Sequence, residues 1–343
     1  MESIRVGVAT DESAPHWEIY LQAVAAADGV EKVSIAGAAG PAAAQASSIL
    51  GPKMEGSYAS VGEMLERLRP HAALVTMEGR NAPEAIRAAL SAGCHVMAEK
   101  PACTRAEDFE PLVRLAERSD RHLMLALATR LHPWIQQARD LVRQGRLGTL
   151  YGASFRFLAD QTRLTTPEYQ GSWFASKTRA GGGQLLWLGI HYIDLAQYIS
   201  GQTIRKVAGL AGNVGGQPMD VEDSAAVALE FDGGLMGTLQ CGYYLDKGYS
   251  CQLMFWGSEG RLSMDMLEGH SLEWYSKAEG VKQFPLESGV IPSLYPRFVQ
   301  AGVDVARGVA APFITGAEAL EVLKAVFAVY RSSETGRTQT LSS

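Results

Sequence analysis

The first 125 or so residues alternate between short apolar runs and longer runs with helical periodicity. The short runs are predicted to be strands at residues 4–8, 33–36, 72–76, 95–98 and 122–127. They are apolar throughout, as the central strands of a parallel sheet are, because both of their faces are buried. Strands that alternate with helices form βαβ units. We therefore predict an α/β fold with a Rossmann-type doubly wound parallel sheet, which binds ligands beyond the carboxyl ends of its strands.

Several helix starts can be placed from capping signals. Ser60 and Thr104 are each followed three residues later by a glutamate, which is the pattern of a capping box. In the first turn between strand and helix, Asp11 or Ser13 is predicted to cap the helix. The Ala- and Gly-rich residues 38–47 are expected to form a loop and a weak helix start.

The pattern changes after a predicted helix at 131–145. Apolar and polar residues then alternate, which indicates mainly antiparallel strands with one buried face, at 150–160, 225–231, 234–244 and 250–257. A helix over about 182–200 interrupts them, and the chain ends with an amphipathic helix at 316–333.

Two domains account for this change of pattern. We predict a dinucleotide-binding Rossmann-like domain at 1–128 and an α+β domain for substrate and oligomerisation at 129–315. The second domain is expected to carry an open, mostly antiparallel sheet. The terminal helix, 316–334, is expected to pack back on the domain junction.

Composition narrows the possible partners. The net charge of −6 provides no basic surface for nucleic acid. No apolar run approaches the ~18 residues of a membrane span, and the N-terminal stretch "MESIRVGVAT" lacks the basic and apolar regions of a secretory signal. Four cysteines show no metal-binding spacing, so we expect buried thiols and no metal. The expected location is the cytoplasm, and the expected partner is a small molecule.

The first turn between strand and helix lacks a glycine-rich fingerprint. Ala9, Asp11 and Ala14 stand where the glycines of G-x-G-x-x-G would approach a pyrophosphate. Two readings stay open: a loop that holds the pyrophosphate in altered geometry, or a structural turn that has lost affinity for it. The end of the second strand offers neither an acid for a ribose nor an arginine for a 2′-phosphate.

The stretch "GGGQLLWLGIH", residues 181–191, contains the best candidate for acid–base chemistry. An imidazole such as that of His191 takes a proton from a hydroxyl near neutral pH, although a lone histidine in an apolar helix can equally be a core residue. Trp187 lies four residues earlier, so on a helix its indole would share a face with His191. Lys100, at the end of a strand, would point into the ligand crevice or simply begin a loop.

Four segments together resemble one family. They are "AALSAGCHVMAEKPACT", "ATRLHPWIQQARDLVRQGRLG", "GSWFASKTRAGGGQLLWLGIHYIDL" and "GAEALEVLKAVFAVYRSSETGR". They resemble the A-x-x-A-G-x-H-V-x-x-E-K-P, R-x-x-P…G-x-[IL]-G and G-G-G-x-L-x-D-x-G-x-H elements and the terminal helix of the Gfo/Idh/MocA oxidoreductases. The resemblance covers nearly the whole chain.

The resemblance implies a Rossmann domain that carries NAD or NADP, and an open sheet that forms a homodimer or homotetramer. It implies that Lys100 and His191 are catalytic, and that Trp187 replaces the aspartate of the family motif. An indole donates one hydrogen bond and never ionises, so it cannot do the work of an aspartate. Against the cofactor the resemblance places Ala9, Thr10, Asp11, Thr76, Glu99 and Lys100.

We therefore expect an NAD(P)-dependent oxidoreductase that acts on a hydroxyl or keto carbon of a sugar, cyclitol or related polyol. Residues on the substrate side would be Arg130, Trp173, Lys177, Arg179, Trp187, Asp194 and Tyr244. The family's T-P-x-x-x-H loop is replaced by "TMEGRNAPEA", which puts Glu78 and Arg80 near the crevice. Two alternatives stay open: a catalytically silent ligand-sensing or regulatory protein on this fold, and a glycosidase or lyase that uses the nicotinamide as a transient redox shuttle.

Overall fold

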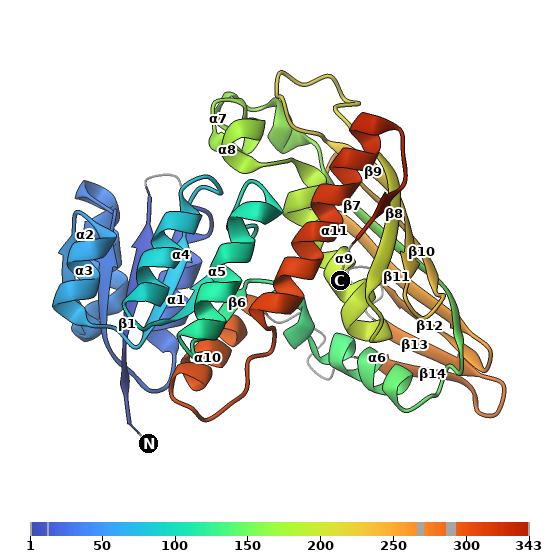
Figure 1. Ribbon diagram of the computed structural model, residues 1–343, viewed down its shortest axis with the longest axis horizontal. Coiled ribbons are helices and arrows are strands. Elements are labelled where there is room, and N and C mark those ends of the chain that lie inside the picture. Colours follow the sequence, from blue (N-terminus) through green and yellow to red (C-terminus); the bar gives the residue numbers. More distant parts are fainter. Residues whose placement is uncertain (1, 12–13, 266–270, 286–292, 342–343) are drawn as a thin grey trace. The chain divides into compact units, whose positions relative to one another are not determined.

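The computed structural model describes residues 2–11, 14–265, 271–285 and 293–341. The chain forms two compact units, each built around its own sheet (Figure 1). Unit 1 consists of Met1–Ala128, Thr178–Gly181 and Ser293–Leu320. Unit 2 consists of Thr129–Lys177, Gly182–Pro292 and Glu321–Ser343.

Unit 1 contains the predicted parallel sheet, with strand order β3-β2-β1-β4-β5-β6. Its strands are β1 (Ile4–Thr10), β2 (Val30–Ala36), β3 (Met54–Tyr58), β4 (Ala72–Thr76), β5 (His95–Ala98) and β6 (Leu123–Leu125). All five predicted strands are confirmed, and β4 is buried at every position, as its apolar sequence requires. The edge strand β3 was not predicted, because its sequence "MEGSY" has no apolar run and no residue of it is buried.

Helices connect these strands, and the doubly wound α/β prediction is confirmed. The helices are α1 (Trp17–Ala26), α2 (Gly40–Leu50), α3 (Val61–Leu68), α4 (Ala82–Ser91), α5 (Ala106–Arg118) and α10 (Leu294–Ala306), with a 3₁₀ turn η1 (Gly51–Lys53) after α2. Although α10 comes from late in the chain, it packs on α1 and β5 and buries Phe298 completely.

The capping predictions have mixed outcomes. Ser60 caps α3, because its hydroxyl accepts a hydrogen bond from the Glu63 N–H at 3.2 Å. The box at Thr104 is wrong: α5 begins at Ala106 after Arg105, whose guanidinium pairs with Asp108 instead. Asp11 does not cap α1, since that helix begins at Trp17 with no side-chain cap. Ser13 lies outside the described residues.

Unit 2 contains a mostly antiparallel sheet with strand order β14-β13-β12-β11-β7-β10-β9-β8-β15, in which β7 and β10 form a parallel pair. Its strands are β7 (Leu150–Asp160), β8 (Ile204–Gly212), β9 (Ser224–Phe231), β10 (Met236–Leu245), β11 (Tyr249–Gly257), β12 (Gly260–Asp265), β13 (Ser271–Ser276), β14 (Gly280–Pro285) and β15 (Gln339–Thr340). The four predicted strands, now β7, β9, β10 and β11, form the centre of this sheet. The outer strands were missed; β8, "IRKVAGLAG", is rich in small residues and lacks a strong alternation.

One face of this sheet is covered by helices. The helical segments of this part of the chain are η2 (Ala128–Leu131), α6 (Pro133–Arg143), η3 (Thr162–Thr165), α7 (Pro167–Gln170), η4 (Trp173–Ala175), α8 (Lys177–Ala180), a π-helical turn η5 (Leu185–Gly189), α9 (Ile190–Ser200) and α11 (Gly316–Thr335). α9 packs on β7 and β10. Near its end, α11 lies directly over β8, where the Ser332 hydroxyl accepts a hydrogen bond from the Gly209 N–H at 3.1 Å.

Three further observations concern the cysteines, possible metal ligands and the lengths of the helices. All four cysteines are buried and free, and burial raises the pKa of the Cys94 thiol to about 11. Among the described residues, no three His, Cys, Asp or Glu side chains gather as a metal site would require. Within the same ranges, no helix has the length and apolar character needed to cross a membrane.

Candidate active site

A pocket of about 320 Å³ lies at the carboxyl ends of β1 and β2 in unit 1. Most of its lining side chains are small; the lining consists of Thr10, Asp11, Ala14, Trp17, Ala38, Ala39, Pro41 and Ala42. It includes the start of α2, which no side chain caps. A doubly wound sheet binds a dinucleotide in this position, and the N-terminus of a helix attracts phosphate. The pocket thus has the position and the small lining residues that a dinucleotide needs.

The loops that follow β1 and β2 approach each other very closely at this pocket. Gly37 has a φ of +88°, and a Cβ atom on it would lie 2.0 Å from the carbonyl oxygen of Thr10. Only glycine tolerates both this backbone conformation and this contact. The glycine that shapes the crevice therefore follows β2, instead of following β1 as in the usual fingerprint.

Asp11 fastens the loop after β1 to the loop after β4. Its Oδ2 accepts hydrogen bonds from the Glu78 N–H at 2.9 Å and from the Asn81 side chain at 3.4 Å. Among the described residues that line the pocket, Asp11 is also the one that carries a charge. A carboxylate at this position repels a phosphate group, so the charge of the pocket suits a dinucleotide less well than its shape does.

The loop after β4 is held by an ion-pair cluster within unit 1. Glu78 is buried, and its two carboxylate oxygens pair with Arg179 at 2.5 Å and with Arg80 at 3.1 Å. The hydrogen bond to Glu78 raises the pKa of the Arg179 guanidinium. Arg179, expected on the substrate side, is thus engaged by Glu78.

Glu99 and Lys100 follow β5 and are both buried. The Tyr20 hydroxyl donates a hydrogen bond to Glu99, and His16 lies 3.7 Å from the same carboxylate oxygen. Burial alone would raise the pKa of Glu99, but His16, Lys100 and Tyr20 together bring it below its ordinary value. Thr76, at the end of β4, donates a hydrogen bond to the Pro15 carbonyl at 2.7 Å. Unit 1 therefore brings a lysine and a charged glutamate to the carboxyl end of β5.

In unit 2, the helix predicted over 182–200 consists of two parts. It begins as the π-helical turn Leu185–Gly189 and continues as α9. Trp187 lies in the π-helical turn and is buried, whereas His191 lies in the first turn of α9 and is half-buried. π-Helical turns inside helices are frequent at functional sites. The candidate acid–base residue thus lies two positions after an unusual backbone segment.

Trp187 belongs to an aromatic cluster. Its ring packs edge-to-face on Trp173 and Phe174, with centroid distances of 5.1 Å and 4.6 Å, and those two rings stack on each other at 4.2 Å. Trp173 is only 1% exposed, so it anchors the cluster from within. An indole takes the place of the carboxylate that the family motif has here.

Arg130 and Asp194 form a buried ion pair. The Arg130 guanidinium donates hydrogen bonds to Asp194 from Nε at 3.0 Å and from Nη2 at 2.7 Å. It also lies over the ring of Tyr198, with its Cζ 4.7 Å from the ring centroid. Each residue is at most 2% exposed. The pair joins the segment before α6 to α9, the helix that carries His191.

Two further residues expected on the substrate side make other contacts in unit 2. Lys177 is exposed and pairs with Glu334 at 2.9 Å. The ring of Tyr244 lies over Gly242 on β10. The alternate residues Leu239 and Cys241 face the other side of β10, where the Gly189 backbone of the π-helical turn packs. Tyr244 therefore lies on the opposite face of the sheet.

Glu222, which binds the backbone a few residues before Trp187, is a residue that sequence reasoning missed. It is buried just before β9, and its carboxylate binds the backbone at Gly183 and Leu185. The partners lie 37 and 39 residues apart in the chain, so no local pattern marks them. The glycine run at 181–183 was the available signal, because residues without a Cβ allow another backbone or a ligand to approach closely.

Family models match both units of the chain. A model described as "Oxidoreductase family, NAD-binding Rossmann fold" matches residues 13–127, and the model of the GFO/IDH/MocA C-terminal domain matches residues 135–263. The first match covers β2 to β6 and α1 to α5 of unit 1, and the second covers the segment of unit 2 that carries Trp187 and His191.

Individual proteins give the same result. The rhizopine catabolism protein MocA of Rhizobium meliloti is 28% identical over 71% of this chain and 73% of its own length. The D-glucoside 3-dehydrogenase of Escherichia coli is 30% identical over 53% of this chain and 55% of its own length. The structure of a levoglucosan dehydrogenase in complex with NADH and L-sorbose is similar in fold, with a TM-score of 0.86, 19% identity and coverage of 99% of both chains. The chain belongs to the Gfo/Idh/MocA family of NAD-binding oxidoreductases.

Proposed function

We propose that this protein is an NAD(P)-dependent dehydrogenase or reductase acting on a hydroxyl or keto carbon of a sugar, cyclitol or related polyol. The observation that carries the proposal is the pocket at the ends of β1 and β2, which has the dinucleotide position of a doubly wound sheet although the glycine fingerprint is missing. The relatives named as a D-glucoside dehydrogenase and a levoglucosan dehydrogenase support the substrate class.

Unit 1 would hold the dinucleotide, and unit 2 would hold the substrate. Thr10, Asp11 and Ala14 after β1, with Ala38 and Ala39 after β2, would contact the adenosine side of the cofactor. Ala9 and Thr76, at the ends of β1 and β4, and Glu99 and Lys100 after β5 complete the cofactor residues that we propose. The nicotinamide supplies hydride chemistry when it is bound.

His191 would exchange the proton of the substrate hydroxyl. Its imidazole is half-buried at the start of α9, directly after the π-helical turn. The ammonium of Lys100, buried after β5, would stabilise negative charge on the substrate oxygen. One acid–base group supplies about 10²- to 10⁴-fold in rate. The proposed chemistry therefore does not require the aspartate that the family motif has at the position of Trp187.

Trp187 would form a wall on the substrate side. The indole is fixed by Trp173 and Phe174 and presents an apolar surface in place of a hydrogen-bonding carboxylate. The substrate would accordingly bring an apolar ring face to this side of the site.

A second candidate function is a ligand-sensing or regulatory protein without turnover. Two observations favour it: Trp187 stands where the family motif has an acid, and Asp11 brings negative charge to the pocket in which phosphate would bind. This candidate requires ligand binding but no hydride transfer.

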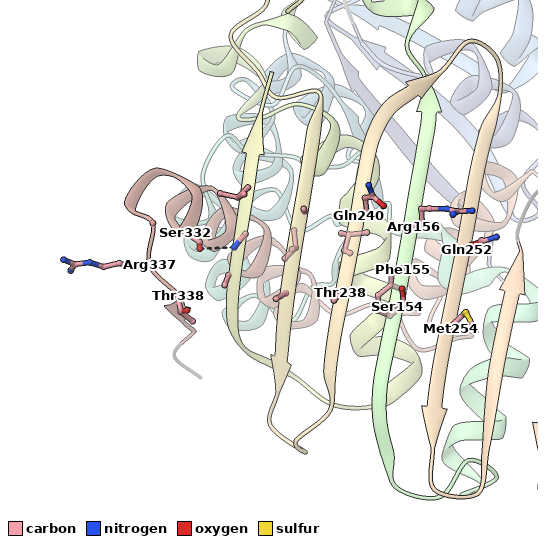
Figure 2. Close-up of a pocket in the computed structure, with 18 residues that line it drawn as sticks. Ser154, Phe155, Arg156, Thr238, Gln240, Gln252, Met254, Ser332, Arg337 and Thr338 are labelled. Carbon is pink, nitrogen blue, oxygen red and sulfur yellow. Dashed lines mark hydrogen bonds between the residues drawn. The ribbon is translucent and has the colours of Figure 1, made fainter. Parts of the chain in front are cut away.

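The open face of the sheet in unit 2 supports a homodimer, with a homotetramer as its extension. A hollow of about 780 Å³ lies on this face, and Figure 2 shows Arg156, Gln240 and Gln252 among the side chains that line it. Leu210 and Met236 are large apolar residues that stay 71% and 64% exposed in the single chain. A broad face with apolar residues and few charges is typical of a subunit interface.

Because the cysteines are free, we place the protein in the cytoplasm.

The test is a screen of sugars and cyclitols with NAD⁺ and NADP⁺, followed by the absorbance of the reduced nicotinamide. Wild type should turn over at least one of them, and His191→Ala should lose about 10²- to 10⁴-fold in turnover. Unchanged turnover in His191→Ala would remove the proton-transfer role. Binding of cofactor with no turnover of any compound would favour the regulatory function.

A further inference from the structure

The backbone at the start of the π-helical turn is held almost entirely by one distant residue, Glu222. Its Oε2 accepts the Gly183 N–H at 2.7 Å, and its Oε1 accepts the Leu185 N–H at 2.9 Å. The N–H between them, that of Gln184, donates to the Glu222 carbonyl oxygen at 3.0 Å. Three consecutive backbone donors therefore have the same residue as their acceptor.

This contact replaces a cap that the local sequence lacks. Neither Gln184, before the π-helical turn, nor Gly189, before α9, provides a side-chain cap. The first N–H groups of a helix have no acceptor inside the helix, and burying them without one is unfavourable. A carboxylate at this end of a helix also interacts well with the helix dipole. Glu222 provides these acceptors, while burial raises the pKa of its carboxyl above the ordinary value.

The glycines at 182 and 183 allow this contact. A Cβ on Gly183 would lie 1.9 Å from the Glu222 carbonyl oxygen, and a Cβ on Gly182 would lie 2.2 Å from the Tyr330 hydroxyl. The Tyr330 hydroxyl in turn donates a hydrogen bond to Glu222 Oε1 at 2.8 Å. The glycine run is thus explained by packing within unit 2, against Glu222 and the end of α11.

The contact continues into the residues of the proposed site. The Trp187 N–H donates a hydrogen bond to the Gly183 carbonyl at 2.9 Å. Gly183, whose own N–H binds Glu222, is therefore also bonded to the backbone of Trp187. On the other side of this turn, a Cβ on Gly189 would lie 3.0 Å from the Cys241 sulfur, so the sheet leaves no room for the turn to shift. His191 follows two residues later. The carboxylate and the sheet thus fix the turn from its two ends.

We propose that Glu222 is a positioning residue, which fixes the π-helical turn and thereby sets the placement of Trp187 and His191. The glutamate touches the backbone before these residues and acts on the reaction only through them. The structural part of this proposal stands on the contacts above, and its consequence for turnover rests on the proposed function of His191.

The test compares three variants by hydrogen–deuterium exchange and by kinetics. Glu222→Gln keeps the size of the side chain but places an amide donor where one backbone N–H needs an acceptor. Tyr330→Phe removes only the hydroxyl that braces the carboxylate. Glu230→Gln is the matched control, because Glu230 lies on β9 and its carboxylate pairs with Lys206 near the surface.

Exchange in peptides covering 183–191 should rise about tenfold or more in Glu222→Gln, which corresponds to the loss of one acceptor for a buried backbone donor. It should rise less in Tyr330→Phe and stay unchanged in Glu230→Gln, while peptides from β1 and β4 stay protected in all three. In kinetics, Glu222→Gln should lower kcat about tenfold or more and leave KM for the dinucleotide unchanged, since the dinucleotide pocket belongs to unit 1.

Unchanged exchange at 183–191 in Glu222→Gln would overturn the proposal, whatever the activity. If Glu222→Gln does not fold, Tyr330→Phe decides: a rise confined to 183–191 supports the proposal, and a uniform rise over unit 2 overturns it. An inactive wild type would refute the proposed function, but the exchange measurement would still test whether Glu222 fixes the π-helical turn. A shift in exchange without any change in kcat would overturn the link from Glu222 to His191.

Discussion

Trp187 packs edge-to-face on Trp173, with 5.1 Å between the ring centroids. The indole is held as a buried part of an aromatic cluster, and Trp187 is only 6% exposed. The position has therefore been built into the packing of unit 2.

Restoring the family's acid by Trp187→Asp should lower stability and not raise activity. The change leaves a large cavity beside Trp173 and Phe174 and buries a carboxylate, with an expected loss of about 3–5 kcal/mol in the free energy of unfolding. Urea denaturation of wild type, Trp187→Asp and the control Trp187→Phe would measure it. Higher turnover of Trp187→Asp with unchanged stability would contradict this prediction, because it would show that the tryptophan lowers activity and contributes nothing to packing.

Breaking the Arg130–Asp194 pair from either side should destabilise unit 2 strongly. Both groups are buried, and Asp194→Ala leaves the guanidinium without its partner, at an expected cost of about 3–5 kcal/mol. The exposed pair Lys206–Glu230 is the control, for which Glu230→Ala should cost at most about 1 kcal/mol. If Asp194→Ala and Glu230→Ala lowered the free energy of unfolding equally, the buried pair would not be what holds α9 to the segment before α6.

The stability of unit 1 should depend on pH through His95. Burial and then the charge of Arg121 lower the pKa of His95 from 6.5 to about 4. Its Nδ1 also accepts a hydrogen bond from the His122 N–H at 3.2 Å, which requires the neutral ring. The unfolded chain binds a proton before the folded one, so the stabilisation is complete above pH 6.5 and is lost as pH falls toward 4.

Thermal unfolding of wild type and His95→Asn across this pH range tests the assignment. The difference in melting temperature between them should change between pH 6.5 and 4 and stay constant above it. A constant difference over the whole range would show that His95 has an ordinary pKa. The comparison removes the contribution of carboxylates, which titrate equally in both proteins.

Asp11 should disfavour NADP relative to NAD. Its carboxylate lies in the pocket lining, and the 2′-phosphate of NADP would add negative charge there. Asp11→Asn should narrow the ratio of the two dissociation constants by about tenfold, or ~1.4 kcal/mol, since it removes one repulsion. Calorimetric titration of both proteins with both dinucleotides gives the ratio. The same ratio in wild type and variant would place the 2′-phosphate away from Asp11.

The parts of the fold that local patterns determine could be predicted from the sequence. β4 and β5 were placed to the residue, because each is an apolar run bounded by breaks. The edge strand β3 was missed because it has no apolar run and no buried residue, and β8 was missed because its sequence is rich in small residues. The start of α1 at Trp17 was also missed, since Asp11 bonds to a loop 67 residues away instead of capping the helix.

The candidate site follows the same rule. The motifs identified Lys100 and His191, and the structure places both on the elements expected for them, after β5 and in the helix after the glycine run. Glu222 could not be found, because its partners are backbone atoms far away in the chain. Nor could the pairing of Arg130 with Asp194, or of Arg179 with Glu78, be read from spacing. Their side chains meet only after the strands and helices have packed.

The most direct test of the central claim is whether the pocket after β1 and β2 binds a dinucleotide. The purified protein would be denatured and its supernatant assayed for NAD(H) and NADP(H), and the native protein would be titrated with each by calorimetry. We predict release of nucleotide, or binding at micromolar affinity or tighter, with NAD preferred. If no nucleotide is released and neither dinucleotide binds even at millimolar concentration, that result contradicts the assignment of an oxidoreductase.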